Sequence, residues 1–87
     1  MKKVHILYNP YLDDHYAICE MGHDYFCQES IKNRNLEETL KTLKTLFSAR
    51  GKKKIEFIID LSLPKKEKDI LKNFIYNNFS KATCTED

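Results

Sequence analysis

The segment NLEETLKTLKTLFSARG, residues 35–51, constrains the fold more than any other part of the chain, because its periodicity is helical. Glutamate and lysine fill one side, and apolar residues recur at spacings of three or four on the other, at Leu36, Leu40, Leu43 and Phe47. This stripe predicts an amphipathic helix over 36–50 that packs one face on a core. Asn35 suits its N-cap, where Glu38 would complete a capping box, and Gly51 suits its end.

Short segments in which apolar and polar residues alternate predict strands. Residues 2–8 alternate until Asn9-Pro10, where proline cannot donate to a ladder. Residues 15–21 alternate again, and a shorter strand over 24–29 could pair back on them. After the helix, residues 55–61 form a further strand whose inward face comprises Ile55, Phe57, Ile59 and Leu61.

A second amphipathic helix is predicted over 65–79, after a turn marked by Ser62 and Pro64. Its apolar stripe consists of Ile70, Leu71, Phe74, Ile75 and Phe79. Residues 81–87, KATCTED, predict a frayed tail. We therefore predict a single small domain over residues 1–80.

The order ββ(β)αβα predicts an α+β domain with a three- or four-stranded sheet and two helices on one face. That arrangement lets a single core bury both apolar helix stripes. If residues 55–61 lie parallel to residues 2–8, the helix between them is a crossover, as in a β-grasp arrangement. With 87 residues, the chain has little surplus for a deep catalytic cleft.

The N-terminal residues contain no uninterrupted apolar run of the kind found in signal peptides or membrane spans. The chain has three cysteines, an odd number, at Cys19, Cys27 and Cys84. These features predict a cytoplasmic protein with reduced thiols and no membrane association.

The stretch HYAICEMGHDYFC spaces His15, Cys19, His23 and Cys27 four residues apart. A tetrahedral zinc needs all its ligands within about 2.0–2.3 Å of one point. Along a strand, four residues span about 13 Å, and twelve residues of helix span about 18 Å. We therefore interpret these cysteines as small hydrophobic residues beside surface histidines.

Catalytic arrangements are equally poorly supported by the sequence. Cys27 follows His23 by four residues, but no third orienting group or oxyanion donor is indicated. The two glycines, Gly22 and Gly51, form no phosphate-binding loop. We expect a non-enzymatic protein without a metal or other cofactor.

The segment YNPYLDDHY is the most suggestive of partner binding. Aromatic and acidic side chains surround a proline turn there, as in interface hot spots, and the candidate residues are Tyr8, Tyr11, Asp13, Asp14 and Tyr16. The alternative is that Tyr8 and Tyr16 simply close the edge of the core. An open edge of the first strand or of the hairpin strand is a further possible contact surface.

Two basic clusters allow a nucleic-acid hypothesis. They comprise Arg50, Lys52, Lys53 and Lys54 before the strand at 55–61, and Lys65 and Lys66 at the start of the second helix. Because that strand separates them, the clusters could lie at opposite ends of the sheet. A nucleic-acid surface favours a continuous basic track with interleaved aromatics, so solvated loop charge is the alternative interpretation.

The succession of KKVHILYNPY, a hairpin with a glycine turn, a leucine-rich helix, IEFIIDL and a final helix is similar to a small module at the N-terminus of some bacterial dynamin-like or related GTPases. The resemblance covers residues 2–79, and its specific part is Ile-Leu-Tyr-Asn-Pro-Tyr. The chain departs from the family pattern in having no tryptophan in the helix and in reading Asp60-Leu61-Ser62 where the family has a His-Gly-Thr turn. The resemblance implies a scaffold or adaptor module and assigns no catalytic residue.

These observations favour a protein-interaction module of a bacterium or of its phages and mobile elements. It would act as an adaptor, or as a small inhibitor or regulator, on a larger protein partner. The alternative is a nucleic-acid-binding accessory protein that uses the basic clusters. The pattern leaves the oligomeric state open.

Overall fold

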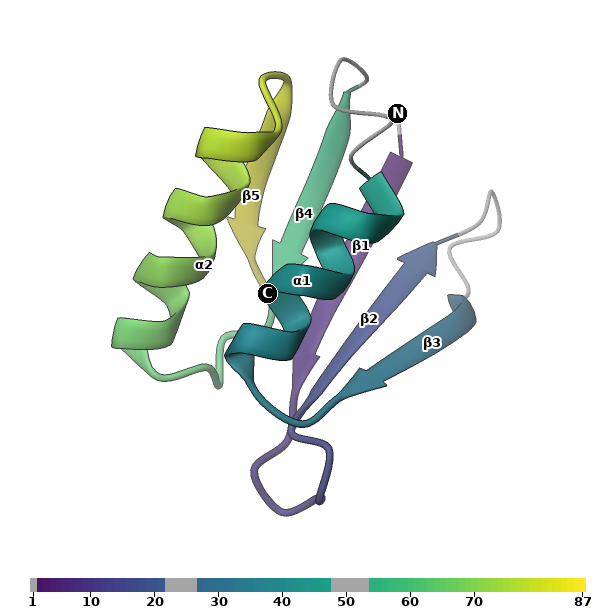
Figure 1. Cartoon of the computed structure of the whole chain (residues 1–87), viewed down its shortest axis with the longest axis vertical. Coiled ribbons are helices and arrows are strands. Elements are labelled where there is room, and N and C mark those ends of the chain that lie inside the picture. Colours follow the sequence, from purple (N-terminus) through teal and green to yellow (C-terminus); the bar gives the residue numbers. More distant parts are fainter. Residues whose placement is uncertain (1, 22–26, 48–53) are drawn as a thin grey trace.

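The computed structural model describes residues 2–21, 27–47 and 54–87, with residues 27–29 described by their backbone alone. The predicted α+β class is confirmed, with two helices packed on one face of a mixed sheet (Figure 1). In chain order the elements are β1 (Lys2–Tyr8), β2 (Tyr16–Met21), β3 (Cys27–Asn33), α1 (Leu36–Phe47), β4 (Ile55–Ile59), α2 (Lys65–Asn78) and β5 (Ala82–Glu86).

The described strands form one five-stranded sheet in the order β3-β2-β1-β4-β5. β1 pairs with β2, and β2 with β3, in antiparallel fashion, whereas β1–β4 and β4–β5 are parallel pairs. The parallel pairing of β1 with β4 is the one expected of a β-grasp-like crossover. α1 lies in the connection from β3 to β4, and α2 lies in the connection from β4 to β5.

The prediction of a frayed tail after residue 80 is wrong, because residues 82–86 form β5. This strand continues the sheet along the outer side of β4, with Phe57 opposite Cys84. Ala82 and Cys84 are half-buried and pack against the core, whereas Thr83 and Thr85 are exposed. The sheet thus has one strand more than predicted.

β3 begins and ends later than the predicted range of 24–29, and residues 22–26 lie outside the described residues. Ile18 of β2 lies opposite Ile31, and the register shifts between Glu20 and Met21. Asn33, at the end of β3, is buried, and its Oδ1 accepts a hydrogen bond from the Thr42 hydroxyl at 2.8 Å. This bond ties the end of β3 to α1.

The core lies between the helices and one face of the sheet. Val4 and Ile6 of β1 lie opposite Phe57 and Ile59 of β4, so their side chains share that face and are fully buried. The rings of Phe47, Phe57 and Phe79 pack together with centroids 5.5–6.5 Å apart. Truncating a buried phenylalanine in such a cluster costs about 3–5 kcal/mol.

α1 begins as predicted. The Glu38 backbone N–H donates to Asn35 Oδ1 at 2.9 Å, which is the predicted N-cap bond. The Glu38 carboxylate accepts a hydrogen bond from the backbone N–H of Arg34 at 2.9 Å. In the predicted capping box it would accept the N–H of Asn35 instead. The predicted end of the helix at Arg50-Gly51 lies outside the described residues.

Two apolar residues predicted to face the core are exposed. Ile70 of α2 is 42% exposed, because this helix lies toward the β5 side of the sheet and buries only the stripe through Leu71 and Ile75. Leu61 is 59% exposed, since β4 ends at Ile59 and the chain turns at Asp60. Neither described helix is both long and apolar enough to cross a membrane.

Candidate functional site

The segment predicted to bind a partner forms a loop over residues 9–15, here called the aromatic loop, between β1 and β2 at one end of the sheet (Figure 1). The Asn9 N–H donates to the carbonyl of His15 at 2.8 Å and closes the loop at its base. Asn9 Oδ1 accepts the N–H of Tyr11 at 3.0 Å, and its carbonyl accepts the N–H of Leu12 at 3.3 Å. Asn9 therefore fixes the backbone that presents the next residues.

A groove of about 300 Å³ lies between the aromatic loop and the adjoining ends of β1 and β2. Most of its lining is apolar, and the polar residues come from the loop. It is lined by Leu7, Tyr8, Asn9, Leu12, Asp14, His15, Tyr16 and Ala17.

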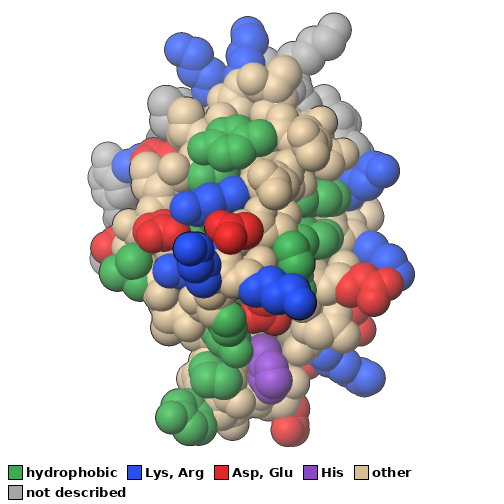
Figure 2. Space-filling view, turned by 90° about the vertical axis from the view of Figure 1, so that its left-hand side faces the viewer, with side chains coloured by type: hydrophobic (Ala, Val, Ile, Leu, Met, Phe, Trp, Pro, Cys, Tyr) green, Lys and Arg blue, Asp and Glu red, His purple; other side chains and the backbone are tan. Residues whose placement is uncertain are grey.

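Two apolar side chains of the aromatic loop face solvent. Tyr11 is 95% exposed and Leu12 is 54% exposed. Hydrophobic side chains gather at this lower end of the molecule, below a band of lysines and carboxylates (Figure 2). Exposed apolar side chains next to a groove are typical of interaction surfaces.

The two carboxylates of the loop add negative charge beside the groove. Asp13 is exposed, and Asp14 is half-buried and lines the groove. Within the described residues, neither forms an ion pair. Both are therefore available to a cationic group of a partner.

Tyr8 and Tyr16, the other two predicted partner-binding residues, are placed differently from Tyr11. Tyr16 is 2% exposed and Tyr8 is half-buried, with their ring centroids 5.2 Å apart. The ring of His15 packs edge-on against Tyr8 at 6.3 Å. For Tyr16 the alternative interpretation applies, because this ring closes the edge of the core.

The Tyr16 hydroxyl lies close to a carboxylate of α2. Tyr16 Oη and Glu67 Oε2 are both buried, and neither has a hydrogen-bond partner among the described residues. Burial raises the pKa of Tyr16 well above its usual value, and the nearby Glu67 carboxylate raises it further. The ring thus stays neutral beneath the aromatic loop.

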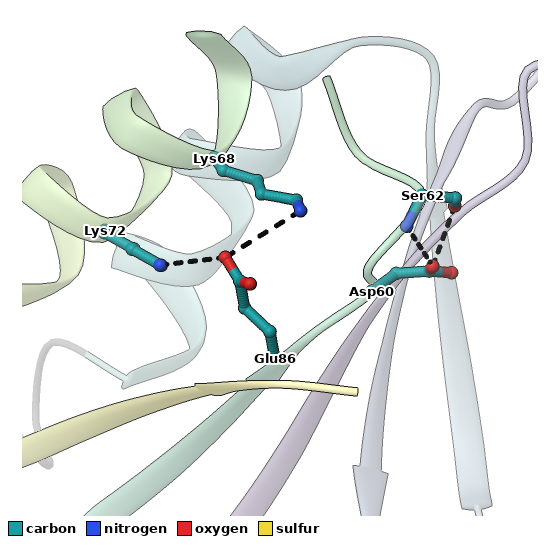
Figure 3. A network of polar contacts seen from close by, with 5 residues as sticks. All are labelled: Asp60, Ser62, Lys68, Lys72 and Glu86. Atoms are coloured by element: carbon teal, nitrogen blue, oxygen red, sulfur yellow. Dashed lines mark hydrogen bonds and ion pairs between the residues drawn. The ribbon is translucent and has the colours of Figure 1, made fainter. Parts of the chain in front are cut away.

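Asp60 anchors the same end of the sheet. Its Oδ1 accepts hydrogen bonds from the N–H and the hydroxyl of Ser62 at 2.9 and 2.7 Å (Figure 3), and its Oδ2 accepts the N–H of Tyr8 at 3.1 Å. Burial alone would raise the pKa of Asp60, but these bonds and the charge of Lys68 together lower it. The carboxylate is engaged in holding the turn and is not a free acid.

A second polar cluster joins α2 to β5. Glu86 Oε1 pairs with Lys72 Nζ at 2.9 Å and with Lys68 Nζ at 3.8 Å (Figure 3). The hydrogen bond from Lys72 is the main cause of a lowered pKa of Glu86, and the same bond raises the pKa of Lys72. This cluster fixes the helix over the edge strand.

The predicted basic surface is not continuous in the described residues. Lys54 precedes β4, whereas Lys65 and Lys66 begin α2 after the other end of that strand. All three are exposed, and they flank β4 at opposite ends, as anticipated from the sequence. Arg50, Lys52 and Lys53 lie outside the described residues.

The cysteines differ from the sequence interpretation. Cys19 is disulfide-bonded, so the prediction of reduced thiols is wrong for this residue. Cys84 is free, and the side chain of Cys27, like the whole of His23, lies outside the described residues. Over the described ranges, no three histidine, cysteine or acidic side chains form a candidate metal site.

Leu12 was not among the predicted site residues, and no partner-binding role was predicted for His15. A signal was present, since Leu12 is an apolar residue between a tyrosine and two aspartates in a turn. Leu7 and Ala17 could not have been singled out in this way, because their alternation only places them on the sheet face opposite the core. They join the groove through the β1–β2 register, in which they lie opposite one another.

The chain was compared with protein-family models, with curated proteins and with solved structures, and none of them matches it. The resemblance to a GTPase-associated module therefore stays a prediction.

Proposed function

We propose that this protein is a non-enzymatic protein-interaction module that binds a larger partner through the aromatic loop. The main support is the combination of two exposed apolar side chains, Tyr11 and Leu12, with a loop backbone that Asn9 holds in place. Because the loop is held by its own hydrogen bonds, binding need not spend much free energy on ordering it. An adaptor, or a bacterial or phage regulator, would use such a surface to cover a site on its partner.

The experiment is a pull-down from bacterial lysate with the tagged chain, with and without nuclease. Bound proteins are identified by mass spectrometry and bound nucleic acid by gel. The test variant is the double substitution Tyr11→Ser with Leu12→Ser, which removes the exposed apolar surface of the loop. The matched control is Tyr76→Ser, because Tyr76 on α2 is 54% exposed, as Leu12 is.

We expect the parent chain and the control to capture one protein in stoichiometric amount, with or without nuclease treatment. The double variant should not capture it. If the double variant captures the protein as well as the parent chain does, the interface lies outside the aromatic loop. Recovery of nucleic acid alone, decreasing as salt rises, would instead favour the nucleic-acid alternative through residues such as Lys65 and Lys66.

A further inference from the structure

The groove beside the aromatic loop combines an apolar lining with an acidic rim. Leu7, Leu12 and Ala17 provide aliphatic surface, and the acidic residue Asp14 is part of the same lining. Tyr8 and His15 also line the groove, and their rings meet edge to face with centroids 6.3 Å apart. An occupant must therefore satisfy an apolar surface and a carboxylate together.

The size of the groove limits what can enter. About 300 Å³ is at the lower end of the range of ligand pockets, so one long side chain fits and a whole helix does not. Leu12 lines this space, whereas the exposed Tyr11 is not one of its lining residues and would contact the surface around the inserted side chain.

The charge beside the groove selects between apolar and cationic occupants. A purely apolar side chain would cover Asp14 without giving its carboxylate a partner, which costs free energy. Lys32 lies opposite Ala17 on β3, yet no ion pair joins it to Asp14 in the described residues. The exposed Asp13 adds a second negative charge nearby.

We infer that the groove receives an arginine side chain of the partner, an inference that rests on the proposed interaction function. The three methylenes of the arginine lie along Leu7, Leu12 and Ala17, since such stems pack well on apolar surface. Its guanidinium meets the carboxylate of Asp14 and stacks on the ring of His15. A planar fork suits both contacts better than an ammonium does.

The test is an NMR titration of the full ¹⁵N-labelled chain with small probes at millimolar concentration. The probes are N-acetyl-arginine amide, N-acetyl-lysine amide and N-acetyl-norleucine amide, the last of which has an aliphatic stem without charge. We expect saturating shifts of the amides of Leu7, His15 and Ala17 with the arginine probe, and weaker binding of the other two. Asp14→Asn should weaken arginine binding about two- to fivefold, the range of partly exposed ion pairs, and Asp13→Asn should weaken it less.

Several outcomes would overturn the inference. Equal or tighter binding of the norleucine probe would make the groove an apolar site, and equal binding of the lysine probe would remove the preference for arginine. An absence of saturating shifts at the groove would reject it outright. If the probes fail while the pull-down still depends on Tyr11 and Leu12, the interaction function stands without the arginine site. If the probes bind but no captured protein depends on the loop, the proposed function fails instead.

Discussion

Asp60 Oδ2 accepts a hydrogen bond from the backbone N–H of Tyr8 at 3.1 Å, across 52 positions of sequence. Tyr8 is the last residue of β1, from which the aromatic loop departs, and Asp60 directly follows β4. The Ser62 hydroxyl also approaches the carbonyl of Tyr8, at 3.4 Å. One carboxylate thus links the base of the candidate binding loop to the turn that leads into α2.

Asp60→Asn tests this link. We expect the free energy of unfolding at pH 7 to fall by about 1 kcal/mol, because a charged acceptor of three hydrogen bonds is replaced by a neutral one at a partly exposed site. The pKa of Asp60 is lowered in the folded protein, so its stabilisation is present above the unfolded value of about 4 and is lost as pH falls through the lower folded value. Urea unfolding between pH 2 and 7 should show a shallower acid slope in the variant.

Ser62→Ala serves as the control for that experiment. It removes the hydroxyl donor but keeps the carboxylate and its bonds to the two backbone N–H groups of Tyr8 and Ser62. Its effect at pH 7 should be smaller, and its acid slope should stay close to that of the parent chain. An acid slope that is identical in Asp60→Asn and in the parent would contradict the role assigned to Asp60.

Tyr16→Phe concerns the buried hydroxyl beneath the aromatic loop. Because that hydroxyl is buried without a hydrogen-bond partner in the described residues, we expect its removal to leave stability at pH 7 unchanged or to raise it by up to about 1 kcal/mol. The pKa of Tyr16 is raised in the folded protein, so the unfolded chain releases its proton first and stability falls as pH rises above about 10. The variant should lose part of this alkaline decline in urea titrations at pH 8–11.

Tyr11→Phe, at an exposed position of the loop, is the matched control and should behave like the parent chain. A loss of more than about 2 kcal/mol in Tyr16→Phe at pH 7 would mean that the hydroxyl makes a strong hydrogen bond to Glu67. That result would contradict the arrangement described above.

Thiol accessibility tests the placement of the cysteines. Burial raises the pKa of Cys84, and a hydrogen bond from Tyr76 and the charge of Lys72 only partly offset this effect. Less thiolate is therefore present at pH 8, and iodoacetamide should label Cys84 slowly in the folded, unreduced protein. Intact mass spectrometry should show faster labelling of Cys84 in urea, while Cys19 stays unlabelled until a reductant is added. Labelling of Cys19 without reductant would contradict its disulfide.

Periodicity was sufficient to predict the elements whose apolar stripe is long or regular. β1 was predicted with its observed bounds, and the N-cap bond of Asn35 with Glu38 was predicted from spacing alone. Both signals are local. The alternation of a strand and the three-residue spacing of an N-cap bond can each be recognised from a few neighbouring residues. The exposure of Ile70 was not predictable in this way, since it depends on where α2 lies over the sheet.

The groove could be predicted only in part. Tyr11 and the aspartates stand out by residue type, but the groove exists because the Asn9 N–H bonds the His15 carbonyl and folds the loop back on Leu7 and Ala17. Five residues separate Asn9 from His15, and nothing in their types requires that bond. A sequence pattern therefore indicates that a loop binds without giving the shape of its site.

The short sequence of β5 gives only a weak strand signal, and the strand depends on pairing with β4, which is distant in the chain. The Asp87 N–H donates to the Ile59 carbonyl, and the Asp87 carbonyl accepts the Leu61 N–H, so the backbone of Thr85, two residues earlier, also faces β4. Thr85→Pro removes that N–H and should lower the free energy of unfolding by about 2 kcal/mol or more. Thr85→Ala keeps the backbone donor and changes only an exposed side chain, so it should cost less than about 1 kcal/mol. Urea unfolding of the two variants separates these effects, because a tail that frays would tolerate proline as readily as alanine.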